Sequence, residues 1–129
     1  MYCKNLYYLL ISAFLSSLLF ASEMETQEVF VSGRGGYHTY RIPAIIRTSR
    51  GSLLAFCEGR RDSRQDTGNI DLLLKRSTDN GRNWSEPILI WDDGANTCGN
   101  PCAVINHATG EIFLLATWNL GSDHEKEII

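Results

Sequence analysis

The sequence has 129 residues and a formal net charge of −3, and charged residues make up 21% of it. This length suits one small domain, and no basic patch with interleaved aromatic residues favours a nucleic-acid partner. Hydrophobic residues amount to 43%, which is ordinary for a soluble globular protein. Composition therefore bounds the size and the class of the protein but does not indicate an activity.

The first segment of the chain differs from the rest. Lys4 precedes an apolar run that continues to Phe20 and is followed by small residues at Ala21-Ser22. One cation, a short apolar core and small residues at its end are typical of a secretory signal peptide, which we place at residues 1–22. An uncleaved N-terminal anchor is the alternative, because the run approaches the ~20 residues that span a bilayer. Both interpretations predict a secreted, periplasmic or other extracytoplasmic protein.

Strand patterns dominate after this segment, and no stretch shows sustained helical periodicity. Gly- and Asn-bearing turns separate the expected strands, and residues 92–100 are expected to form a loop. Such short, regularly spaced strands predict an all-β meander, as in a sandwich, a barrel or a propeller. Residues 41–91 hold four strands, the size of one propeller blade, and a second blade begins near residue 101. The expected strands are 29–31, 41–48, 52–58, 69–77, 87–91, 103–106 and 111–117.

Three cysteines follow the N-terminal segment. Cys57 stands in an apolar strand and is expected to be a small buried hydrophobic residue. Cys98 and Cys102 form either a local disulfide, as an oxidising compartment would allow, or two free thiols in a loop. No histidine or second cysteine pair stands at zinc spacing, so we expect no metal site.

The most specific local pattern comes directly after the apolar segment 70–74. Ser77, Asp79, Gly81 and Trp84 spell S-x-D-x-G-x-x-W, the Asp-box pattern. Asp79 is expected to bond the backbone of its own turn, Gly81 to take a positive φ, and Trp84 to pack its ring under the turn. The pattern is thus interpreted as a folding device without a catalytic role. An ordinary Asn-Gly hairpin followed by a core tryptophan is the alternative.

Three further patterns precede this turn in the chain: Tyr40-Arg41-Ile42-Pro43, Glu58-Gly59-Arg60-Arg61 and Asp66-Thr67-Gly68-Asn69. Their order and spacing, together with the Asp-box, resemble the N-terminal part of the sialidase (neuraminidase) family over residues 29–119. The resemblance implies an all-β, six-bladed β-propeller, of which residues 27–129 would form about one and a half blades. It also implies an exo-α-sialidase, a retaining glycoside hydrolase that releases terminal sialic acids from glycoproteins, glycolipids or oligosaccharides without a cofactor.

The resemblance assigns the two main chemical roles to single residues. Arg41 is implied to hold the carboxylate of the substrate, a task that suits the planar guanidinium fork. Without the flanking Ile42-Pro43, an edge arginine that covers apolar surface would be the preferred interpretation. Asp66 matches the general acid/base, which protonates the leaving oxygen and then activates water. Asp62 and Asp71 are its competitors, and from the residues alone all three aspartates would be solvated loop charges.

Three more residues are implied to contact the sugar. Arg60 takes the position of the family's second N-terminal active-site arginine, and Arg61 beside it is expected to point to the opposite face. Asn100 lies where relatives place a polar side chain near the 4-hydroxyl, and some of them carry Asp there. Trp118 resembles the aromatic residue of the N-acetyl pocket, with core packing as a nearly equal alternative.

The remaining catalytic residues of the family are not assigned in this sequence. The tyrosine nucleophile, its glutamate partner and two more arginines come from later blades. We therefore expect the 129-residue chain by itself to be an inactive fragment. Two rival functions stay open, a non-catalytic sialic-acid-binding propeller and an Asp-box scaffold. The expected partners are sialylated glycoconjugates, whereas linkage preference, hydrolase versus transferase activity and oligomeric state stay open.

Overall fold

The computed structural model describes residues 25–127, so the expected signal or anchor segment, residues 1–22, lies outside the described residues. In the part that is described, no helix has the length and apolar character needed to cross a membrane. The elements are β1 (Thr39–Arg47), β2 (Leu53–Arg60), β3 (Ile70–Ser77), β4 (Ile88–Trp91), β5 (Thr97–Ile105), β6 (Ile112–Asn119) and a short 3-10 helix, η2 (Glu125–Glu127).

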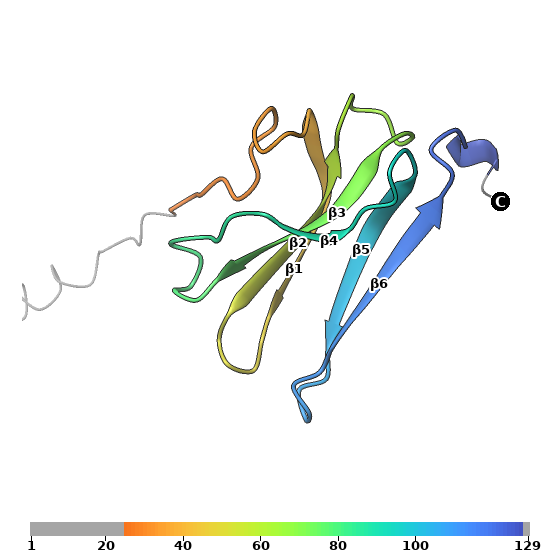
Figure 1. Cartoon of the computed structure of the whole chain (residues 1–129). Helices are drawn as coiled ribbons and strands as arrows, with labels where there is room; N and C mark the ends of the chain where they lie inside the picture. The colour runs from red at the N-terminus through yellow and green to blue at the C-terminus, as the bar shows by residue number, and fades with distance from the viewer. Residues whose placement is uncertain (1–24, 128–129) are drawn as a thin grey trace, which may run out of the picture.

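The strands form one antiparallel meander and one hairpin (Figure 1). β1 pairs with β2, β2 with β3 and β3 with β4, all antiparallel. β5 and β6 form an antiparallel hairpin, which joins the meander through a single parallel pair, Ile70 with Thr97. Within the described residues the sheet runs in the order β1-β2-β3-β5-β6 and does not close on itself. The all-β expectation is confirmed, and residues 41–91 form the four-stranded unit that was predicted.

The core lies on the two inner strands of the meander. Phe56, Cys57, Leu72 and Leu73 each expose 3% or less of their surface. Burial raises the pKa of the Cys57 thiol to about 12, so this residue packs as a small hydrophobic side chain, as expected. Strands covered on both sides read as nearly continuous apolar runs, which is the pattern of β2 and β3.

The segment before β1 is held by side-chain packing instead of strand pairing. Residues 29–31, which were expected to form a strand, are irregular. The ring centroid of Phe30 lies 5.3 Å from that of Tyr40, and the Lys75 ammonium lies 5.5 Å from the centroid of Phe30. The apolar character of residues 29–31, which suggested a strand, therefore reflects the packing of Phe30 against the sheet.

β1 and β5 carry the same backbone irregularity. The register of β1 shifts between Arg41 and Ala44, and the register of β5 shifts just after Gly99. Each shift contains a residue that precedes proline and has a positive φ, 52° at Ile42 and 51° at Asn100. This conformation is strained for a β-branched residue, so the surrounding sheet must hold Ile42 in place. We call these two irregularities the twin bulges.

The prediction of a loop at residues 92–100 is therefore wrong for residues 97–100. β5 already begins at Thr97, and Gly99-Asn100-Pro101, which has the composition of a turn, forms a bulge inside the strand. Cys98 is buried and Cys102 is exposed, and both are free thiols. Of the two alternatives for this pair, the structure has the free thiols.

The turn at residues 77–84 is closed by its own side chains. The Ser77 hydroxyl donates to Oδ1 of Asp79 over 2.8 Å and accepts the Gly81 N–H at 2.8 Å. Asp79 also accepts the backbone N–H of Asn83 at 2.9 Å, and this bond is the main cause that lowers the pKa of its carboxyl to about 2. The indole N–H of Trp84 donates to the Gly81 carbonyl over 3.0 Å. The bond from the backbone to Asp79 is the one that the sequence predicted, and the bonds of Ser77 and Trp84 add to it.

Candidate functional site

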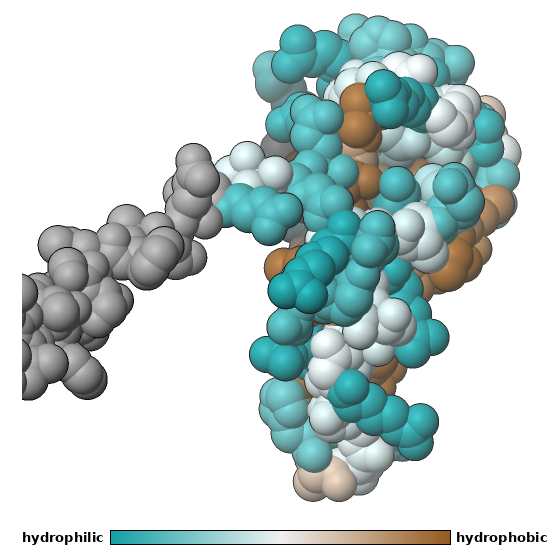
Figure 2. All heavy atoms as spheres, turned by 90° about the vertical axis from the view of Figure 1, so that its left-hand side faces the viewer, coloured by the Kyte–Doolittle hydropathy of each residue, from teal (hydrophilic) through white to brown (hydrophobic). Residues whose placement is uncertain are grey.

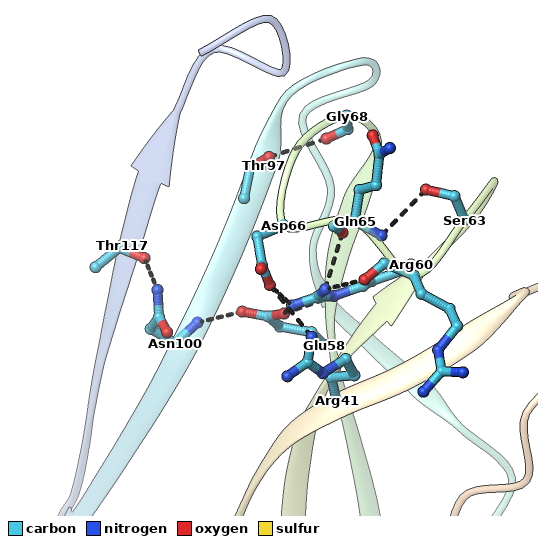
Figure 3. A network of polar contacts seen from close by, with 11 residues as sticks. Arg41, Glu58, Arg60, Ser63, Gln65, Asp66, Gly68, Thr97, Asn100 and Thr117 are labelled. Carbon is cyan, nitrogen blue, oxygen red and sulfur yellow. Dashed lines mark hydrogen bonds and ion pairs between the residues drawn. The ribbon is translucent and has the colours of Figure 1, made fainter. Parts of the chain in front are cut away.

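One cavity gathers most of the predicted site residues. It has a volume of about 310 Å³ and opens where β1, β2, β5, β6 and the loop after β2 meet (Figure 3). The residues predicted at positions 41, 60, 66 and 100 all line it, although they come from distant parts of the sequence. The lining residues are Arg41, Ile42, Glu58, Arg60, Asp66, Thr97, Asn100 and Asn119.

Arg41 is the exposed cation of the cavity. It lies directly before the first of the twin bulges, and its side chain is 46% exposed. Among the described residues its guanidinium has one ionic partner, Asp66, with Nη1 and Oδ1 separated by 3.6 Å. A guanidinium with uncommitted N–H groups offers the two parallel donors that a carboxylate ligand accepts. Position 41 thus has the exposure and the donors that anion binding requires.

Arg60 is buried, with only 3% of its side chain exposed. Its Nε and Nη2 donate to Oε2 of Glu58 over 3.1 and 2.7 Å. Its Nη1 donates to the carbonyls of Arg64 and Gln65 over 2.7 and 2.8 Å. The remaining Nη2 donor meets Oδ1 of Asp66. All five guanidinium N–H groups are therefore engaged by the protein, and Arg60 reaches the cavity through the donor that it shares with Asp66.

Glu58 is the site residue that sequence reasoning missed. Its side chain is 4% exposed, and both of its oxygens are in use. Oε2 accepts from Arg60, and Oε1 accepts the backbone N–H of Asn100 at 2.9 Å. Gly99 makes this approach possible, because a Cβ atom at that position would collide with Oε1 of Glu58. The available signal was an acidic residue at the end of an apolar strand, two positions before an arginine.

Asp66 is exposed at the edge of the cavity, and the loop that carries it is anchored on both sides. Its side chain is 64% exposed and lies between Arg41 and Arg60. Before it, the carbonyls of residues 64 and 65 accept from Arg60. After it, the hydroxyl of Thr97 donates to the carbonyl of Gly68 over 2.9 Å. These contacts place a solvent-accessible carboxylate next to the exposed guanidinium of Arg41.

The second arginine of the pair, Arg61, belongs to a different cluster, as predicted. Its Nε and Nη2 donate to Oδ2 of Asp71 over 3.0 and 2.7 Å. Tyr37 also donates its hydroxyl to this oxygen over 2.6 Å, and burial is the main cause that raises the pKa of Tyr37. Asp71 is fully buried, and neither it nor Asp62 lines the cavity. Of the three competing aspartates, Asp66 alone is at the candidate site.

The two remaining predicted contacts, Asn100 and Trp118, differ in their placement. Asn100 lines the cavity, and its side-chain amide donates to the hydroxyl of Thr117 over 2.9 Å. Trp118 is 47% exposed and donates its indole N–H to Oδ2 of Asp93 over 2.8 Å. Because neighbouring residues of a strand face opposite ways, Trp118 points away from the side on which Asn119 lines the cavity. The structure does not bring Trp118 to the other site residues.

The arrangement suits acid–base chemistry on an anionic ligand. The exposed guanidinium of Arg41 can bind a carboxylate, and the exposed carboxyl group of Asp66 can donate a proton when protonated and accept one when ionised. Asn100 adds a neutral hydrogen-bonding group. Within residues 25–127, no three His, Cys, Asp or Glu side chains gather in a way that would hold a metal ion.

No protein-family model matches the chain, but individual proteins do. It is 41% identical over 91 residues to an exo-alpha-sialidase of Aspergillus fumigatus and 38% identical over 104 residues to an exo-alpha-sialidase of Arthroderma benhamiae. These alignments cover 65% and 76% of this chain but 22% and 25% of the relatives. A sialidase of Micromonospora viridifaciens is 37% identical over 92 residues, which cover 67% of this chain and 14% of that protein. The chain thus spans about a quarter or less of these curated relatives.

The fold is also similar to that of a solved sialidase. A structure of a Hadza microbial sialidase matches with a TM-score of 0.64 and 30% sequence identity. The match covers 71% of this chain and 20% of that chain. The six strands therefore correspond to part of a sialidase β-propeller, and the open sheet in Figure 1 corresponds to one blade and part of the next.

Proposed function

Because this chain belongs to the sialidase family, we propose that it supplies the first part of the active site of an exo-α-sialidase. Such an enzyme would hydrolyse terminal sialic acids from glycoproteins, glycolipids or oligosaccharides with retention. The observation that carries the proposal is the meeting of Arg41 and Asp66 at one cavity, with an exposed guanidinium 3.6 Å from an exposed carboxylate.

In the proposed reaction, Arg41 binds the carboxylate of the sialic acid through parallel N–H···O bonds. In the structure the same guanidinium pairs with Asp66. A substrate carboxylate would compete for Arg41 and leave Asp66 with Arg60 as its ionic partner, beside the glycosidic oxygen. Asp66 would then protonate the leaving group and, in the second step, activate the attacking water.

The other predicted contacts have supporting roles in this proposal. Arg60 acts on the sugar only through the N–H group that it shares with Asp66, since its other donors are engaged. Asn100, an exposed residue that lines the cavity, would hydrogen bond a ring hydroxyl. Trp118 stays a prediction, because its ring would have to serve a part of the sugar site outside this cavity.

Two features outside the cavity complete the proposal. We propose that the turn formed by Ser77, Asp79, Gly81 and Trp84 is an Asp-box whose role is structural, which its internal hydrogen bonds support. We also propose that residues 1–22 direct the protein out of the cytoplasm. Its proposed substrates, sialylated glycoconjugates, would be met in that extracytoplasmic compartment.

The test is the substitution Asp66→Ala in the whole protein that carries this chain. A general acid matters most for a poor leaving group, so single-turnover cleavage of a sialyl-galactoside should fall by roughly 10²–10⁴-fold. Cleavage of an aryl sialoside should fall much less, and a sialic-acid-like inhibitor should still bind. Asp62→Ala is the matched control in the same loop and should cleave both substrates like the wild type.

Two outcomes would contradict the proposal. An equal loss for both substrates would assign Asp66 a structural or binding role. Inhibitor binding without any turnover by the wild-type protein would identify a sialic-acid-binding propeller instead of an enzyme.

A further inference from the structure

We infer that Glu58 is a positioning residue of this site, which fixes the loop bearing Asp66 and the second of the twin bulges relative to each other. Its effect on catalysis rests on the proposed function, whereas its effect on the geometry does not. Figure 3 shows the contacts that carry the inference, with Glu58 between Arg60 on one side and Asn100 on the other.

The first step is the burial of two opposite charges. The side chains of Glu58 and Arg60 are 4% and 3% exposed, and Nη2 of Arg60 lies 2.7 Å from Oε2 of Glu58. A buried charge without a partner is costly, so each of the two groups requires the other. Both Nε and Nη2 donate to the same carboxylate oxygen, which fixes the plane of the guanidinium.

The second step leads from this guanidinium to Asp66. Glu58 holds the Nε edge of Arg60. The two N–H groups of Nη1 then donate to the carbonyls of Arg64 and Gln65. These two carbonyls immediately precede Asp66 in the chain. The position of Asp66 therefore depends on Glu58, a side chain of β2 that does not contact the loop directly but acts through Arg60.

The third step leads in the opposite direction, to β5. Oε1 of Glu58 accepts the N–H of Asn100, a residue 42 positions away, over 2.9 Å. β3 stands between β2 and β5 in the order of the sheet, so this bond joins two strands that do not pair with each other. Asn100 has a positive φ at that point, and Gly99 leaves the space that the carboxylate fills. One buried carboxylate thus ties the acid-bearing loop to the bulge of the next blade.

The first experiment needs no enzymatic turnover. In the full chain labelled with ¹⁵N, the Arg60 Nε–H should give a slowly exchanging NMR signal, because this donor is buried and bonded to Glu58. Glu58→Gln removes the charge and leaves one acceptor oxygen for the donors of Arg60 and the N–H of Asn100. Exchange of the signal should therefore become at least about tenfold faster, as expected where a charge-assisted hydrogen bond worth at least about 1.4 kcal/mol is lost. The backbone amide signals of residues 64–68 should shift with it.

Two further variants keep this experiment decisive. Glu86→Gln, at an exposed position, is the control and should change neither the Arg60 signal nor residues 64–68. Glu58→Asp keeps the charge on a shorter side chain and should partly restore the slow exchange, and it carries the test if Glu58→Gln does not fold. The inference is overturned if residues 64–68 are unchanged in both Glu58 variants. It is also overturned if all strands shift equally, because that result assigns Glu58 to general stability.

The second experiment measures catalysis in the whole protein. If Glu58 acts through Asp66, Glu58→Gln should slow cleavage of a sialyl-galactoside more than cleavage of an aryl sialoside. Adding Glu58→Gln to Asp66→Ala should then cost little more, since residues that act through one another are not additive. Fully multiplicative losses would overturn the inference. A wild-type protein without turnover would contradict the proposed function alone, because the NMR experiment would still decide the role of Glu58.

Discussion

Replacing Ser77 with alanine tests the structural role of the turn at residues 77–84. The Ser77 hydroxyl is buried, at 1% exposure, and it holds Oδ1 of Asp79 and the N–H of Gly81 at 2.8 Å each. Removing a hydrogen-bond partner from a buried group costs about 1–3 kcal/mol. Asp79 and Gly81 are partly accessible to water, so we expect the lower half of that range, about 1–2 kcal/mol. For a domain of this size the melting temperature should fall by roughly 4–10 °C.

Urea denaturation and thermal melting of the Ser77→Ala chain measure this loss. The midpoint should decrease without a change in the slope of the urea transition, because the surface exposed on unfolding stays the same. Ser122→Ala is the control, since Ser122 is exposed and its hydroxyl has only a 3.4 Å contact with Asp123. A melting temperature equal to that of the control would refute the argument. An unchanged melting temperature combined with lost turnover in the whole protein would place Ser77 in the chemistry.

The remaining predictions concern Asp79 and two arginines. The folded-state pKa of Asp79, about 2, lies below its ordinary value, so its stabilisation is present above pH ~4 and is lost as the pH falls toward 2. Melts followed by circular dichroism should show a constant difference between wild type and Asp79→Asn above pH ~5 that shrinks below pH ~4; a constant difference down to pH ~2 would contradict this. In the whole protein, Arg41→Lys should lower kcat/KM about 10–100-fold, because a point charge cannot replace bidentate binding. Arg61→Lys keeps a cation at Asp71, so its kcat/KM should stay within about twofold of the wild type. Equal losses of kcat/KM in the two variants would refute the assignment of Arg41 to the cavity and Arg61 to the other cluster.

Local rules predicted most of the strands and the details of one turn. β2, β3 and β4 follow apolar runs separated by turns that contain glycine and asparagine, and the turn at residues 77–84 has the bonds that Ser77 and Asp79 can make. The same rules failed at Gly99-Asn100-Pro101, because these residue types mark turns and bulges equally well. Only the partner strand distinguishes the two, and β6 continues past the bulge to pair with Thr97.

The candidate site could be predicted in part for a similar reason. Arg41 and Asp66 were found through motif spacing, and both are exposed at the cavity. Glu58 was missed because its function depends on a partner 42 residues away, which no local pattern connects to it. Arg60 lines the cavity, but its burial could not be inferred from the sequence, since that burial depends on the same carboxylate. Side chains that act through long-range contacts are thus the part of the site that sequence reasoning leaves out.

The twin bulges give β1 and β5 a similar backbone with different side chains. In β1 the bulge begins at Arg41 and presents a long charged side chain to the cavity. In β5 the shift follows Gly99, which has no side chain, and the backbone N–H of Asn100 donates to the Glu58 carboxylate. The same backbone shape thus positions a cationic side chain in β1 and binds an anionic side chain in β5. A bulge of this kind can therefore contribute either a side chain or a backbone N–H to the same cavity region, depending on whether arginine or glycine precedes it.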